Sequence, residues 1–365
     1  VFRLLGLSWT LGQMFDVDDG VVLRFNGRLP RPTWRSLLAP ARVVAQVVRY
    51  DALRWRADPL LAVAQDRARA LEARDPQRLS WPELLATVRA AMEIPALAGE
   101  VRRRYFPRAA FALLRLRLLL KLVGRAGRLG VLLSGARNMT LEANHALEAL
   151  ASTVRHDPEL RRIFDGHEPR ELAAALARQP SGHRILQELG HFLDHYGHRE
   201  TVISTALEPT WKEAPEVVLG LIRSAAAHPA PPDAEHDPWQ LARDELLAHP
   251  PLRLAPVRAA FLKSLELARV LLPLREDTHY VATLALPPLR RTLIELGSRL
   301  VRAGVLARPE EVFYLHLEEL ERIAEPLPPS PDVTATLRGA VRRRKEARDG
   351  LVGTPLVDPR PFDQR

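Results

Sequence analysis

Cysteine is absent from the 365 residues of this chain, so neither a disulfide nor thiolate chemistry is possible. A chain without disulfides suits a reducing compartment, and we expect a cytoplasmic protein. Aromatic residues make up only 6% of the sequence and are not interleaved with basic residues, as a nucleic-acid stacking platform requires. The net charge of +9 comes from Arg spread along every segment, so nucleic acid is not an expected partner.

Long apolar runs are also missing. No stretch of about eighteen uncharged apolar residues occurs, so no membrane-spanning helix is expected, and the start lacks the apolar core of a signal peptide. The most apolar stretch, 109–133, is interrupted by basic residues, of which Arg117, Lys121, Arg125 and Arg128 recur at helical spacing. This pattern favours an amphipathic helix packed on a core, and a helix lying on a membrane is the alternative.

The composition favours helices. Glycine is modest at 19 residues, hairpin signals are few, and Leu, Ala, Arg and Glu dominate, which is typical of an all-α protein. Only the start differs, because Val21–Phe25 is β-prone and predicts a short β-ribbon or extended segment near the N-terminus. We expect an extended lead-in over 1–33, an elongated multi-helix domain over 34–325, and a linker, basic helix and irregular tail over 326–365.

Helix boundaries follow from capping residues and prolines. Ser80 and Glu83 form the pattern of a capping box, which predicts a helix from there to about Ile94. A second helix is expected over about 96–122. One long helix over about 257–286, with a kink at Pro273, is expected to carry the most polar stretch of the chain.

Histidines concentrate in one short segment. His191 and His195 are one helical turn apart, a spacing that can chelate zinc, but the Glu of the zinc-protease pattern is missing between them, so no metal site is expected. We expect instead that the helix ends at Tyr196 and that Gly197 adopts a left-handed cap. The polar loop 198–200 that follows is placed where binding residues often sit.

The polar stretch Arg275–Tyr280 interrupts apolar surroundings. On a helix, Arg275 and His279 share a face, and Glu276 pairs by spacing with Tyr280. Burying such groups costs several kcal/mol unless they are paired or used. Two interpretations stay open at this point: an internally satisfied Arg/Glu pair that joins two helices, or a functional site.

Several motifs follow the order of one known family. They are Asn26-Gly27-Arg28-Leu29, Asn138-Met139-Thr140-x-Glu142, His195-Tyr196-Gly197-His198-Arg199, Pro209-x-Trp211-x-Glu213-x-Pro215, Arg275-Glu276, Leu296-Gly297-x-Arg299-Leu300 and the segment 310–320. Together they resemble the central helical domain of rifampicin phosphotransferases, relatives of phosphoenolpyruvate synthase and pyruvate phosphate dikinase.

The resemblance implies a role in phosphate transfer. In such enzymes an ATP-grasp part cleaves ATP, a swivelling domain carries the phosphate on a histidine, and the central domain holds the acceptor. This chain resembles the acceptor-binding part of an ATP-dependent dikinase-type phosphotransferase, with a small hydroxyl-bearing molecule as acceptor. Neither the Gly-rich ATP-grasp loop nor the phosphohistidine motif is visible. ATP and Mg are therefore expected on a separate ATP-grasp part, with no cofactor on this chain and no activity of this chain alone.

The resemblance also implies site residues. The family pattern Arg-Glu-x-x-Lys maps onto 275–279, with His279 in place of Lys. It implies catalytic roles for Glu276 and His279, which would accept the proton of the acceptor hydroxyl. The implied substrate-binding residues are Arg275, His198, Arg199 and Glu200. The Lys-to-His departure favours an alternative, a non-catalytic stand-alone helical module that binds an apolar small molecule or a protein partner.

Overall fold

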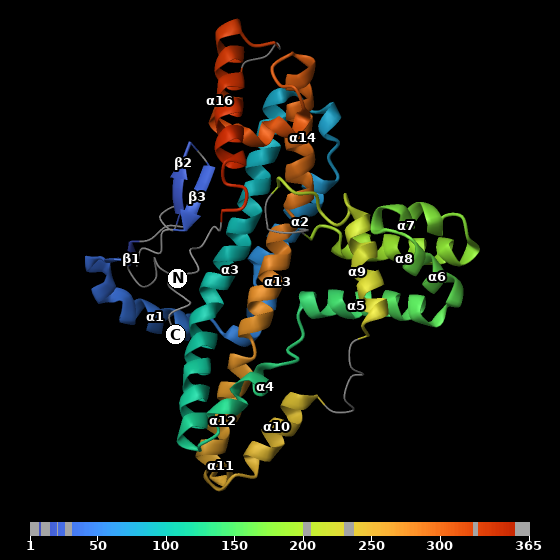
Figure 1. Cartoon of the computed structure of the whole chain (residues 1–365). Coiled ribbons are helices and arrows are strands. Elements are labelled where there is room, and N and C mark those ends of the chain that lie inside the picture. The colour runs from blue at the N-terminus through green and yellow to red at the C-terminus, as the bar shows by residue number, and fades with distance from the viewer. Residues whose placement is uncertain are drawn as a thin grey trace. The chain divides into compact units, whose positions relative to one another are not determined.

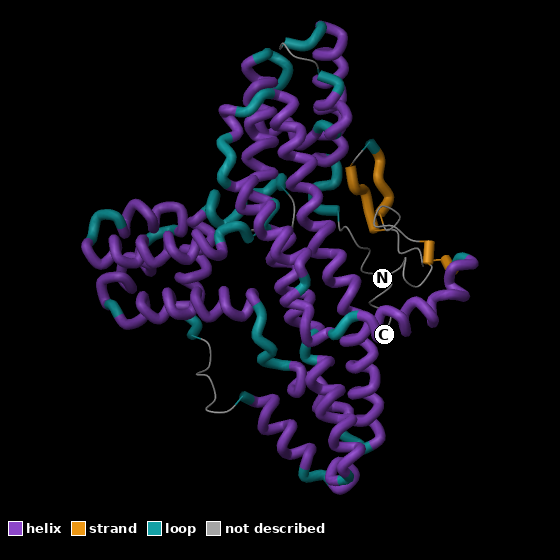
Figure 2. The backbone as a smooth tube through the Cα atoms, turned by 180° about the vertical axis from the view of Figure 1, so that it is seen from behind, coloured by secondary structure: helices purple, strands orange, loops and turns teal. Residues whose placement is uncertain are grey.

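Helices dominate the fold. The computed structural model describes residues 7–8, 15–19, 21–25, 31–199, 206–229, 237–323 and 328–354. Helices make up most of them (Figure 1), and the described strands all lie near the N-terminus (Figure 2). The predicted all-α fold with a short β-ribbon is therefore confirmed.

The chain divides into two compact units. Unit 1 comprises residues 1–45, 73–90 and 288–365, and unit 2 comprises residues 46–72 and 91–287. The domain boundaries expected at residues 33 and 325 were drawn from composition, and they stay a prediction.

Unit 1 contains the strands. β2 (Phe15–Asp18) pairs antiparallel with β3 (Val21–Phe25), and the rings of Phe15 and Phe25 meet edge-on with centroids 5.9 Å apart. β1 (Leu7–Ser8) pairs antiparallel with β4 (Arg31–Pro32). The β-prone run of the sequence is thus one strand of a hairpin, as expected.

The helices of unit 1 enclose an apolar core. Its helical elements are 3₁₀ helices at Trp34–Leu38, Pro76–Arg78 and Pro309–Tyr314, most of α14 (Leu286–Arg302), α15 (Leu317–Glu321), α16 (Pro331–Asp349), and the first parts of α1 (Ala39–Arg49) and α3 (Trp81–Leu122). Trp81, Leu296 and Leu300 are fully buried in this core. The Trp81 indole N–H donates to the carbonyl of Leu320 at 3.3 Å, so the ring is fixed at its polar edge as well as by packing.

Unit 2 is entirely helical in the part that the structure describes. Its elements are 3₁₀ helices at Ala52–Ala57 and Ala126–Arg128, the rest of α3, α2 (Pro59–Glu72), α4 (Leu129–Leu133), α5 (Met139–His156), α6 (Pro158–Gly166), α7 (Pro169–Leu176), α8 (Pro180–Tyr196), α9 (Pro215–Ala227), α10 (Pro238–Leu247), α11 (Pro250–Arg253), α12 (Ala255–Ala268) and α13 (Leu271–Thr283). The largest core cluster packs α5 to α9 together, with Trp211 and Tyr280 against its edge.

Two predicted helix boundaries are wrong. α3 runs without interruption through Pro95, where a break was expected. A proline inside a helix removes a hydrogen bond, but Ile94 and Ala98 on either side are fully buried, so packing keeps the helix continuous. The long helix expected over 257–286 is two helices, α12 and α13, and Pro273 lies in the first turn of α13, where its missing N–H breaks no helical bond.

Candidate functional site

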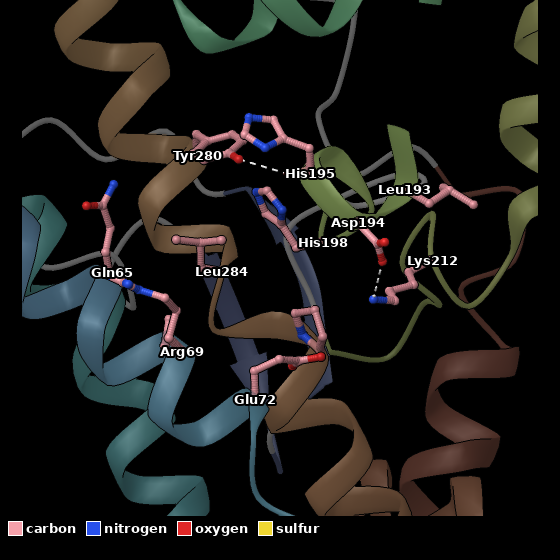
Figure 3. Close-up of a pocket in the computed structure, with 12 residues that line it drawn as sticks. Gln65, Arg69, Glu72, Leu193, Asp194, His195, His198, Lys212, Tyr280 and Leu284 are labelled. Carbon is pink, nitrogen blue, oxygen red and sulfur yellow. Dashed lines mark hydrogen bonds and ion pairs between the residues drawn. The ribbon is translucent and has the colours of Figure 1, made fainter. Parts of the chain in front are cut away.

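A pocket of about 430 Å³ opens in unit 2, within the size range of small-molecule sites. Its walls come from α2, the end of α8, the turn that follows α8, and the C-terminal half of α13 (Figure 3). The lining residues are Gln65, Ala68, Arg69, Glu72, Leu193, Asp194, His195, His198, Lys212, Tyr280, Leu284 and Pro287. Cationic, acidic and apolar side chains therefore meet around one cavity.

The turn after α8 is held by backbone hydrogen bonds. α8 ends at Tyr196 as expected, but Gly197 has φ −67°, so the predicted left-handed cap is wrong. The reason for glycine is close approach: a Cβ on Gly197 would lie 2.2 Å from the Leu193 carbonyl oxygen and 2.9 Å from the Cβ of Lys212. The Lys212 N–H donates to the Gly197 carbonyl at 2.8 Å, and the Trp211 N–H donates to the Arg199 carbonyl at 3.0 Å. These bonds fix His198, between them, on the pocket wall.

Aromatic stacking holds the same turn from the other side. The rings of Phe192 and Trp211 stack with centroids 6.0 Å apart, and the Arg199 guanidinium lies 5.1 Å from the centroid of Trp211. A cation over an indole face is a favourable contact. Arg199 therefore braces the turn and is absent from the pocket lining.

Tyr280 joins α13 to this turn. Its hydroxyl donates to the carbonyl of His195 at 2.9 Å, as the dashed line in Figure 3 marks. Its ring meets the buried ring of His198 edge-on, with centroids 4.3 Å apart. Burial raises the pKa of Tyr280 to about 12, and burial also raises the pKa of Tyr196. At neutral pH Tyr280 is thus a fixed hydrogen-bond donor.

Charged groups surround the mouth of the pocket. Lys212 pairs with Asp194 at 3.0 Å, and both side chains are more than half exposed, so this pair is weak. Arg69 and Glu72 enter from α2 (Figure 3). The pocket can therefore offer cations to an anionic group and His198 to a hydroxyl.

The predicted catalytic residues lie on α13 outside the pocket lining. Glu276 accepts from Arg275 Nη1 at 2.5 Å and from the Thr140 hydroxyl at 2.8 Å. The Arg275 side chain is 72% exposed, and His279 is also exposed. Arg275 and Glu276 form an ion pair, and Glu276 also binds Thr140 of α5, as one of the two interpretations expected. The catalytic roles of Glu276 and His279 stay predictions.

Of the predicted substrate-binding residues, His198 alone lines the pocket among those that the structure describes. Glu200 lies outside the described residues. Lys212 and the α2 residues Arg69 and Glu72 were not predicted from the sequence. Lys212 lies inside the Pro-x-Trp-x-Glu motif, so that motif could have predicted it. α2 carries no motif, and its part in the pocket depends on tertiary packing.

Neither a metal centre nor a membrane span appears in the described ranges. No three His, Asp or Glu side chains gather there in a way that would hold a metal ion, and His191 and His195 are both exposed. None of the helices that the structure describes combines the length and apolarity needed to cross a bilayer.

Comparisons with known proteins find relatives among the phosphotransferases. The model of the family described as rifampicin phosphotransferase fourth domain matches residues 101–276. The chain is 24% identical over 194 residues to an uncharacterized phosphotransferase, YvkC, of Bacillus subtilis, and 28% identical over 199 residues to a rifampicin phosphotransferase of Streptomyces sviceus. Each match covers 52% of this chain and 23% of the relative. A third relative, chondramide synthase of Chondromyces crocatus, is 30% identical over 200 residues, which are 53% of this chain and 5% of that protein.

This helical chain is similar to phosphotransferases, and the similarity covers about half of it. The particular resemblance expected from its motifs is confirmed: residues 101–276 form a rifampicin phosphotransferase-like domain. The matched part of the chain spans about a quarter of the length of the phosphotransferases it resembles.

Proposed function

We propose that this chain binds the hydroxyl-bearing small-molecule acceptor of an ATP-dependent, dikinase-type phosphotransferase. The acceptor occupies the pocket lined by His198 and Tyr280, and the phosphate arrives from a phosphohistidine on a separate domain. The single observation that carries the proposal is this histidine-lined pocket of about 430 Å³ beside a rifampicin phosphotransferase-like segment.

The lining chemistry supports acceptor binding. Leu193, Leu284 and Pro287 offer an apolar wall, while His198 offers a buried imidazole whose position is fixed by its turn and by Tyr280. An imidazole is the side chain best suited to take a hydroxyl proton near neutral pH. Arg69 and Lys212 would screen the negative charge of the transferred phosphate.

The predicted residues on α13 complete the proposal. Glu276 and Tyr280 are four residues apart and share one face of the helix, so Glu276 lies about one turn from the pocket. Arg275 reaches solvent, where an incoming phosphate would meet it. We propose that Arg275 meets the phosphate donor while the pocket holds the acceptor.

The test combines binding with turnover. Binding of hydroxylated macrocycles and of pyruvate is measured by isothermal titration calorimetry, for the chain and for a variant with a filled pocket, Leu284→Trp. The matched control is Leu272→Trp, an exposed leucine on the same helix. AMP and phosphate release are then followed with ATP, Mg and the proteins encoded by the neighbouring genes.

We expect acceptor-dependent AMP formation that is lost in Leu284→Trp and in Arg275→Ala and kept in Leu272→Trp. Acceptor binding without AMP would instead support the alternative of a non-catalytic module. AMP formation that Leu284→Trp leaves unchanged would show that the acceptor binds elsewhere.

A further inference from the structure

A row of large apolar side chains lies exposed on one face of α3. Phe111 is 61% exposed, Leu114 and Leu118 are each 53% exposed, and Leu122 is 83% exposed. Their spacing of three, four and four residues places all of them on one face of the helix. We call this row the α3 stripe.

The α3 stripe is separate from the face that packs in the core. Leu116 and Leu120 are fully buried against Leu132 and Phe261. At about 100° per residue, these two leucines face nearly opposite to the stripe. This part of α3 is therefore apolar on two sides, and the fold of unit 2 covers one of them.

Such a row is unusual on a protein surface. Exposed apolar residues scattered singly are normal, but contiguous apolar patches rimmed by polar residues mark interaction sites. The stripe extends over twelve residues, and its ends are about 16 Å apart along the helix. That is the length of roughly three helical turns of a partner.

The charge on the chain segment that carries the α3 stripe has one sign. Residues 101–141 contain no Asp or Glu but ten Lys and Arg. Arg117 and Lys121 border the stripe on one side and Arg115 borders it on the other, and all three are exposed. The Arg115 Nε donates to the Ser264 hydroxyl at 2.6 Å, which holds this guanidinium in place. The surface is complementary to an apolar partner with carboxylates along its edges.

The width of the stripe favours one kind of partner. A narrow row at three- and four-residue spacing is the seam by which two helices pack, whereas a helix that lies in a membrane presents a broader apolar face. A second copy of the same face would bring Arg117 and Lys121 against like charges, which opposes self-association. We propose that the α3 stripe is a docking surface for an acidic amphipathic helix of a partner protein.

The proposal is tested with a probe of defined chemistry. A helical peptide of about 20 residues, with Leu along its seam and Glu on both flanks, is titrated against the whole chain by fluorescence anisotropy. The double variant Leu114→Gln/Leu118→Gln removes the stripe and keeps helix-forming residues. The matched control is Met92→Gln, an exposed apolar residue earlier on α3.

We expect the stripe variant to weaken binding at least about tenfold, as loss of central anchors does, while Met92→Gln leaves it unchanged. Raising salt from about 50 to about 300 mM is expected to weaken binding of the wild type. The double variant Arg117→Glu/Lys121→Glu is expected to lose the acidic peptide and to gain a peptide whose Glu flanks are replaced by Lys.

Three outcomes would overturn the proposal. One is equal binding of the acidic and the Lys-flanked peptide by the wild type. Another is stripe-dependent binding to phosphatidylglycerol vesicles with no peptide binding, which would assign the surface to a membrane. The third is stripe-dependent dimerisation in analytical ultracentrifugation, which would assign it to a second copy. Circular dichroism confirms that each variant keeps its helix content.

Discussion

Tyr280 links three features of the candidate site. Its hydroxyl binds the last turn of α8, its ring packs on His198, and its backbone belongs to the helix that carries Arg275 and Glu276. The Tyr280 side chain thus connects α13 to the pocket wall. The ring packs against an apolar core, whereas the hydroxyl makes a hydrogen bond. The two contributions can therefore be tested separately.

Replacing Tyr280 with Phe keeps the ring and removes the hydrogen bond to the His195 carbonyl. We expect the free energy of unfolding to fall by about 1 kcal/mol, the usual net contribution of one intramolecular hydrogen bond. Urea denaturation of the whole chain measures the change. Tyr50→Phe is the control, because the Tyr50 hydroxyl makes no hydrogen bond with the described residues; an equal loss in both variants would contradict the role given to Tyr280.

Two tyrosines are expected to titrate late. Burial raises the pKa of Tyr280 and of Tyr105 to about 12, and Tyr105 also donates to Asp58. Unfolded tyrosine ionises near pH 10, so the stability that these two groups contribute is complete below about pH 10 and is lost as pH rises through about 12. Absorbance of tyrosinate should show late steps that Tyr280→Phe and Tyr105→Phe each reduce. Complete titration near pH 10 in the folded chain would contradict this.

At the scale of elements, the N-terminus of α5 is capped from two sides. Asn138 Oδ1 accepts from the Leu141 N–H at 3.0 Å, and Asp277 of α13 accepts from the Met139 N–H at 2.8 Å. The Asn138 Nδ2 also donates to the Ala136 carbonyl at 2.8 Å. The residues next to this cap, Thr140 of α5 and Glu276 of α13, are also hydrogen-bonded to each other. The cap therefore fixes where α5 meets the helix that carries the predicted catalytic residues.

Replacing Asn138 with Ala removes the local half of this cap. We expect a loss of about 1 kcal/mol in the free energy of unfolding, the usual effect of losing an N-cap side chain. Asn138→Ser keeps an acceptor and should lose less. Thermal unfolding followed by circular dichroism compares the two, and an equal loss would show that the cap is not what Asn138 contributes.

At the scale of the whole molecule, Arg344 joins parts of unit 1 that are far apart in the sequence. It is 6% exposed and donates to both oxygens of Glu319, at 2.6 and 3.0 Å, and to Asp19 Oδ1 at 2.8 Å. Hydrogen bonds from Arg344 lower the pKa of Asp19. Burial opposes ionisation of Glu319, but the bonds from Arg344 and the His316 N–H outweigh it and lower the pKa of Glu319.

Arg344→Gln leaves these carboxylates without their cation. We expect a loss of about 3 kcal/mol at neutral pH, as for a broken buried ion pair. Both carboxylate pKa values are lowered by folding, so this stability is present above about pH 4 and is lost as pH falls through their lower folded values. Urea denaturation at neutral and acidic pH should show the variant and wild type converging in acid. Arg342→Gln, at an exposed position on the same helix, is the control, and a constant difference across pH would contradict the assignment.

The sequence by itself determined the helical fold, the family resemblance and several local ends. Leu- and Ala-rich periodicity specifies helices because burial follows a period of 3.6 residues, and the end of α8 at Tyr196 follows from the Gly and polar residues after it. The Arg275–Glu276 contact was one of two interpretations that the sequence left open, and spacing did not select it, because adjacent residues lie about 100° apart on a helix.

Only the tertiary structure decided how these pieces are used. Continuation of α3 through Pro95 depends on buried neighbours, and the approach of Lys212 to Gly197 adds to the space that the Leu193 carbonyl already restricts. The pocket unites α2, the turn after α8 and α13, which are distant in the sequence. They meet because Tyr280 of α13 packs against the core of α5 to α9 while α13 also contacts α2. The sequence pattern shows which face of a helix is apolar. It does not show which other helix covers that face, or which apolar face stays exposed, as on α3, because both depend on how the helices pack.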